Sequence, residues 1–144
     1  MRIVVFTIGK PKLAYARAGV EEYTARLGAD VRVEMLKASA REEESAQLLA
    51  RSEKMLRVVL DERGDQVTSR ELAARLTRWE LDRAKTVAFL IGGADGHTEE
   101  LKQRADWKWS LGKLTLQHEL ATVVLLEQIY RARSIKAGAP YHRD

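Results

Sequence analysis

An apolar run that stops at glycine constrains the fold of this chain more than any other feature. Residues 87–91 read V-A-F-L-I, and three glycines follow within the next five residues. A short apolar run bounded by glycine is typical of a strand buried on both faces, as in parallel sheets covered by helices. Ligands of such sheets bind beyond the carboxyl ends of the strands, where glycine allows close approach. The loop at residues 92–96 is therefore either a binding site or only a turn.

Strand and helix patterns alternate along the rest of the chain. Strands are predicted at residues 2–8, 31–35, 57–60 and 87–91 and within 107–116, and helices at 13–27, 41–55, 68–84, from 98 and at 119–136. Residues 31–35 alternate apolar and charged side chains, which favours a sheet edge. Residues 61–66 are rich in turn formers, and Thr68 and Glu71 match a capping box. The alternation predicts a single three-layer α/β domain over residues 1–144, with a mostly parallel sheet flanked by helices.

Composition narrows the classes of function. The chain has 144 residues, a net charge of +4 and no cysteine. No apolar run approaches the roughly 18 residues of a membrane span, so we expect a soluble protein without a membrane partner, and the lack of cysteine suits the cytoplasm. The three histidines have no ligand spacing, which argues against a metal site. The mild basic excess is compatible with a polyanionic partner.

Several common catalytic motifs are absent from the sequence. The glycines at 92–96 lack the G-x-G-x-x-G spacing and do not follow the first strand, so we reject NAD as a cofactor. No Walker A, H-E-x-x-H or G-x-S-x-G motif occurs.

The last predicted helix carries apolar residues over more than one stripe, among them Leu120, Val124 and Ile129. One sheet face cannot cover all of them, so we favour a homodimer contact over deep burial in the same domain.

Two groups near the end of the chain are candidates for chemistry. Tyr141, His142 and Arg143 place a phenol, an imidazole and a guanidinium side by side, although a solvated tail is an equal alternative. Arg131 and Arg133 are able to stack on bases or bind phosphates. Arg131 is equally well placed to pair with Glu127 one helical turn earlier.

Four segments, taken in order, resemble one known family: L-I-G-G-A-D-G, W-S-L-G-K-L-T-L, E-Q-I-Y-R-A and the terminal P-Y-H-R-D. The chain resembles the small SPOUT-class methyltransferases that modify a pseudouridine at N3 in the helix 69 loop of large-subunit ribosomal RNA. The match spans nearly the whole chain and includes the opening V-x-x-I-G-K and the first-helix segment E-E-Y-x-x-R-L.

This resemblance implies a C-terminal trefoil knot, S-adenosylmethionine as cofactor, an obligatory homodimer and 23S rRNA in the ribosome as partner. By position, the cofactor pocket comprises Leu60 at the end of the third strand, Gly93, Gly112, Lys113, Leu114, Thr115, Leu116 and Gln117. Tyr141, His142 and Arg143 match the family's catalytic tail, in which His142 is a candidate base and Arg143 or Arg131 a candidate anion stabiliser. Arg131, Arg133 and Arg143 are the expected RNA contacts.

Two departures from the family pattern bear on the site. The segment between the second and third strands is shorter than expected, which affects the outer helix and its contribution to RNA binding. Gln117 stands before His118, where the family commonly has proline. Two alternative functions stay open: a non-catalytic RNA-binding module of the same fold, and a SPOUT methyltransferase that acts on tRNA.

Overall fold

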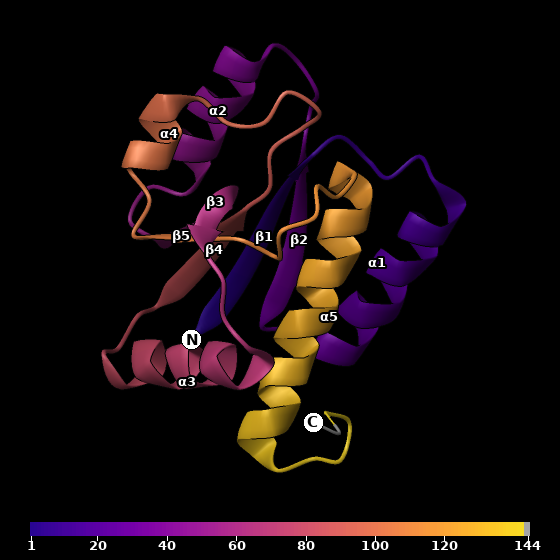
Figure 1. The fold of residues 1–144 in the computed structure, drawn as a ribbon, viewed down its shortest axis with the longest axis vertical. Coiled ribbons are helices and arrows are strands. Elements are labelled where there is room, and N and C mark those ends of the chain that lie inside the picture. The colour runs from indigo at the N-terminus through magenta and orange to yellow at the C-terminus, as the bar shows by residue number, and fades with distance from the viewer. Residues whose placement is uncertain (143–144) are drawn as a thin grey trace.

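The computed structural model describes residues 1–142 and shows a five-stranded parallel sheet with helices on both faces (Figure 1). The strand order is β2-β1-β4-β3-β5. The strands are β1 Arg2–Ile8, β2 Val31–Leu36, β3 Leu56–Asp65, β4 Thr86–Leu90 and β5 Trp107–Trp109. The helices are α1 Ala14–Leu27, α2 Arg41–Arg51, α3 Ser69–Leu81, α4 Glu99–Gln103 and α5 His118–Ala137. The predicted alternation, the parallel sheet and the edge position of the second strand are confirmed.

The sheet divides the core into two layers. On one face Ile3, Val5 and Phe89 of the sheet pack with residues of α1, α3 and α5. On the other face Phe6 and Leu90 pack with residues of α2 and α4. Successive side chains of β1 and β4 therefore enter opposite layers, and this double burial explains why both strands are nearly continuous apolar runs.

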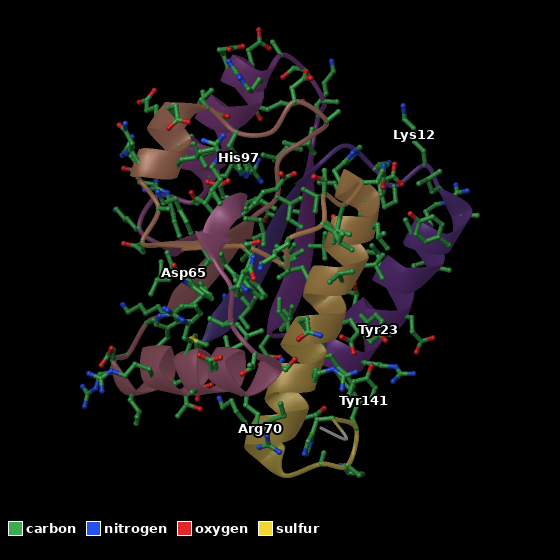
Figure 2. The ribbon with its side chains drawn as sticks, in the orientation of Figure 1. Lys12, Tyr23, Asp65, Arg70, His97 and Tyr141 are labelled. Atoms are coloured by element: carbon green, nitrogen blue, oxygen red, sulfur yellow. The ribbon has the colours of Figure 1, made fainter. Side chains whose placement is uncertain are left out.

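The third strand continues where the sequence predicted a loop. β3 runs through Asp65, with an irregular register against β5 between Leu60 and Asp65. A Cβ on Gly64 would lie 2.6 Å from the Lys108 carbonyl carbon, so glycine permits this close pairing. The Asp65 carboxylate, labelled in Figure 2, also accepts a hydrogen bond from the Trp107 indole at 2.9 Å. The prediction of a loop at 61–66, and of Leu60 as the strand end, was therefore wrong.

Most other boundaries lie within one residue of the prediction, and three differ by more. Helix α2 ends at Arg51 instead of residue 55, and α3 ends at Leu81. The last strand is only three residues long, because Ser110 Oγ donates to the Gly112 carbonyl at 2.8 Å and turns the chain away. The capping box is present as predicted, with Thr68 accepting from the Glu71 amide. Residues 110–117 consequently form a loop that is free to line a site.

Helix α5 lies against both α1 and α3 and crosses one face of the sheet (Figure 1). Leu125, Leu126 and Ile129 are buried, while Leu120 and Val124 are only half-buried. The homodimer contact predicted for this helix stays a prediction. Within residues 1–142, no helix combines the length and apolar character needed to cross a bilayer.

Candidate cofactor pocket and terminal tail

A cavity of about 670 Å³ opens beyond the carboxyl end of β4 and beside the second half of β3. Its walls come from residues 60–63 of β3, the glycine loop after β4, the loop at residues 110–117 and the first turn of α5. Seven of the eight predicted cofactor residues line it: Leu60, Gly93, Gly112, Leu114, Thr115, Leu116 and Gln117. Lys113 belongs to the same loop but is not among the lining residues. Segments distant in sequence thus form one concave surface.

Gly93 is a position where the fold leaves little room for a side chain. A Cβ there would lie 3.0 Å from Glu44 Oε1 and 3.3 Å from Ile8 Cγ2. Glu44 itself is buried, and its other carboxylate oxygen accepts a hydrogen bond from the Ser39 amide at 2.9 Å. Because these buried groups lie directly behind Gly93, any side chain there would displace them or the loop, and glycine lets the loop pack closely at the pocket wall.

His97 directly follows the same loop, between β4 and α4, and is labelled in Figure 2. The residue is 7% exposed, and its Nε2 lies 3.1 Å from the Leu90 carbonyl, so Nε2 is the nitrogen that donates. Burial lowers the pKa of His97 to about 4, which keeps the ring neutral near pH 7. The sequence did not single out His97 as part of the site, because a lone histidine after a glycine loop has no distinguishing spacing.

The last wall of the cavity is joined to the first turn of α5. The Gln117 side chain caps this helix by accepting from the Glu119 and Leu120 amides at 2.9 and 3.1 Å. Glu119 in turn accepts from the Lys12 and Leu13 amides at 2.8 and 3.0 Å, which ties the start of α1 to the pocket. Gln117 therefore serves as a helix cap where the resemblance led us to expect proline.

The terminal tail lies at the other end of α5 (Figure 1). The Tyr141 hydroxyl donates to Glu127 Oε2 at 2.9 Å, and Arg131 Nη1 donates to the His142 carbonyl at 2.7 Å. Ala121 is the last α5 residue on the cavity wall. Arg131 lies ten positions further along the chain, or about 15 Å along a helix axis. Within one chain the structure does not bring Tyr141 and His142 to the pocket.

Two of the three arginines predicted to contact RNA are engaged within the chain. Arg131 pairs with Glu127 at 2.7 Å, the alternative considered from the sequence. Arg133 pairs with Asp30 and donates to the Leu27 carbonyl at 3.3 Å. Arg143, predicted for catalysis and RNA binding, lies outside the described residues.

A second hollow of about 660 Å³ lies at the amino ends of β1 and β4, with Arg2, Arg83 and Lys85 on its walls. Ligands of open parallel sheets bind at the carboxyl ends of the strands, and the glycine loop lies there. We therefore assign the candidate site to the cavity at the carboxyl ends. Among residues 1–142, no group of three or more His, Cys, Asp or Glu side chains is arranged to hold a metal ion.

Comparison with known proteins identifies the family. Residues 1–142 match the family model described as "Predicted SPOUT methyltransferase". The ribosomal RNA large subunit methyltransferase H of a Thermus thermophilus strain is 49% identical over 143 residues, which cover 99% of each chain. Proteins of the same name from Deinococcus deserti and Methylibium petroleiphilum are 46% and 41% identical over 99% and 100% of this chain, and over their full lengths. The chain therefore belongs to the SPOUT methyltransferase family.

Proposed function

We propose that this protein uses S-adenosylmethionine to methylate N3 of a pseudouridine in the helix 69 loop of 23S rRNA. The observation that carries the proposal is the glycine-walled cavity, because seven of the eight residues assigned by resemblance line it together. The relatives named ribosomal RNA large subunit methyltransferase H support the choice of substrate. The family resemblance supports the pseudouridine, its N3 atom and the C-terminal knot.

The residues of the cavity fit the proposed cofactor. Its volume of about 670 Å³ lies within the range of small-molecule sites. The loops at 92–96 and 110–117 bring main-chain groups to the wall, and these groups are able to bind the polar edge of an adenine base. The absence of a side chain at Gly93 lets this loop pack closely on Glu44 and Ile8 behind the wall. When bound, S-adenosylmethionine supplies an electrophilic methyl group on a sulfonium.

The chain itself must position the pseudouridine and remove its N3 proton. His142 is the proposed base, since histidine is the side chain that most often serves as a general base. Arg143 is the proposed partner of the N3 anion and of RNA phosphates. Arg131 and Arg133 would have to leave Glu127 and Asp30 before they bind phosphate. The match of Arg143 to the family's tail makes it the first choice among the three arginines.

We also propose that the active unit is a homodimer. The tail and the cavity lie at opposite ends of α5, so His142 meets a cofactor pocket only if that pocket belongs to another copy. The half-buried apolar residues of α5, Leu120 and Val124, support this helix as the contact surface. A helix-to-helix contact of two copies in opposite directions would bring each tail towards the other copy's cavity.

Mass spectrometry of helix 69 fragments tests the substrate. Ribosomes from cells that lack this protein should lose N3-methylpseudouridine, and expression of the protein should restore it. An unchanged level would reject the substrate, and a mark lost from tRNA instead would favour the alternative tRNA enzyme. Calorimetry with S-adenosylmethionine tests the cofactor: no binding at submillimolar concentration would favour the non-catalytic RNA-binding module.

A further inference from the structure

The first-helix segment E-E-Y-T-A-R-L matches the family pattern, but none of its residues lines the cavity. Two of its residues, Tyr23 and Arg26, contact the terminal tail instead. Tyr23 and Arg26 lie on α1, on the side that meets the terminal tail, and Tyr23 lies beside Tyr141 (Figure 2). The two hydroxyl oxygens are 3.0 Å apart, although 118 positions separate the residues. This contact joins the first helix directly to the proposed catalytic tail.

The hydroxyl contacts have only one consistent arrangement of protons. Tyr141 has a single hydroxyl proton and donates it to Glu127 Oε2 at 2.9 Å, because an ionised carboxylate only accepts. The bond between the two tyrosines must therefore use the proton of Tyr23. Arg131 extends this series of hydrogen bonds by donating to Glu127 and to the His142 carbonyl, both at 2.7 Å. The backbone of the proposed base is thus fixed by the same set of contacts.

Aromatic packing holds the Tyr141 ring as well. Its centroid lies 4.7 Å from that of Tyr130 in an edge-to-face arrangement. The Arg26 guanidinium lies 5.6 Å from the ring centres of Tyr23 and Tyr130 and 6.0 Å from that of Tyr141. Glu22 orients this guanidinium through a hydrogen bond of 2.8 Å. The cation therefore lies within interaction range of three rings at once.

These contacts leave Tyr141 poorly suited to proton transfer. Its hydroxyl both donates and accepts within the chain. Burial, followed by the bonds to Tyr23 and Glu127, raises the pKa of Tyr141 above its ordinary value, so the phenol stays neutral. A neutral phenol that is bound on both sides acts as an anchor for the residue that follows it.

We propose that Tyr23 and Arg26 are positioning residues that hold the tail through Tyr141, so that His142 is presented to the second copy in one geometry. The proposal rests on the function proposed above, because it assumes that His142 acts as the base for methylation. Positioning of this kind affects the rate of the chemical step, since small displacements of a catalytic group are costly. Binding of the cofactor should be unaffected, because neither residue lines the cavity.

The variant Tyr23→Phe removes one hydroxyl and keeps the ring. We expect kcat on ribosomes to fall about tenfold, the effect of losing one hydrogen bond that acts on the transition state. The KM for ribosomes and the Kd for S-adenosylmethionine should stay unchanged. Tyr15→Phe is the matched control, because Tyr15 lies on the same helix and is 52% exposed. Arg26→Lys should keep less activity than Arg17→Lys, an exposed control on α1.

Hydrogen exchange of the amides at residues 139, 141 and 142 tests the anchor without any activity assay. Faster exchange in Tyr23→Phe than in Tyr15→Phe, together with a lower kcat, supports the proposal. Equal exchange in the two variants overturns the anchor, and faster exchange with unchanged kcat overturns the positioning role. If the wild-type protein methylates no ribosomal RNA, the proposed function fails, and the exchange rates alone then decide whether Tyr23 holds the tail.

Discussion

The two ends of α5 are built in different ways. At its first turn lies a cavity formed largely by loops, with glycine at positions 93 and 112 and a neutral histidine behind one wall. In its second half, paired charged and phenolic side chains hold the tail against α1 and α5. The comparison shows that one chain contains both halves of a proposed active site but keeps them apart.

The two ends also differ in what they leave unsatisfied. The cavity is open, and its wall residues Leu114 and Thr115 are exposed. At the tail, each hydrogen-bonding group of the Tyr141 and Glu127 pair has a partner within the chain. The pocket wall is therefore open to solvent, whereas Tyr141 and the His142 backbone are held by contacts within the chain.

Filling Gly93 should break the pocket and leave the tail intact. We expect Gly93→Val to weaken S-adenosylmethionine binding by at least roughly a hundredfold, because the new side chain meets Glu44 and Ile8 and displaces the loop. Calorimetry measures the loss. Gly93→Ala should show a smaller loss, since it adds only the Cβ. Equal binding by wild type and Gly93→Val would mean that this loop is not the cofactor wall.

Acid should weaken the pocket end through His97. The pKa of His97 is about 4 in the folded chain and near 6.5 when unfolded. The unfolded state therefore binds more protons as pH falls from 6.5 towards 4, and the free energy of unfolding decreases. The expected decrease is roughly 3 kcal/mol, because each pKa unit corresponds to about 1.4 kcal/mol.

Urea unfolding at a series of pH values measures this contribution. His97→Gln keeps a side-chain donor for the Leu90 carbonyl but does not titrate, so its stability should change less across the same range. Asp30 and Glu80, whose carboxyl pKa values are lowered by Arg133 and Lys136, lose stabilisation as well, at the acidic end of the range. Parallel curves for wild type and His97→Gln would contradict the account of His97.

The smallest effect is expected from the ion pair between Arg133 and Asp30, near the start of β2. Their side chains are 35% and 47% exposed, so solvent screens the pair. A double-mutant cycle with Arg133→Ala and Asp30→Ala should give a coupling of about 0.5 kcal/mol in unfolding free energy. A coupling above about 2 kcal/mol would contradict the account that solvent screens this pair.

The sequence was informative where local patterns decide the structure. Residues 87–91 were predicted to form a strand buried on both faces, and both layers of the core bury this strand, which spans Thr86–Leu90. Thr68 and Glu71 marked the start of α3 because a capping box needs only four consecutive residues. The extension of β3 through Asp65 was missed, since it depends on the approach of Lys108 and on the Trp107 indole, which are distant in sequence.

The candidate site divides in the same way. The cofactor residues from Gly112 to Gln117 were assigned by resemblance. They form one continuous segment, and most of it lies within a motif that matches the family. The contact between Tyr23 and Tyr141 has no local signature, since a tyrosine on a helix is equally suited to the core or the surface. Glu44 behind Gly93 and His97 beside Leu90 were missed for the same reason. Such contacts exist only after the chain has folded.

The central claim is that the pocket of one copy works with the tail of another. Gly93→Val should have a defective pocket and His142→Ala a defective tail, and we expect each protein alone to be nearly inactive. After subunit exchange, half of the dimers should be mixed, and one of their two sites should be intact. The account predicts recovery of about a quarter of wild-type methylation. No recovery, with mixed dimers demonstrated by differently tagged subunits, would contradict it.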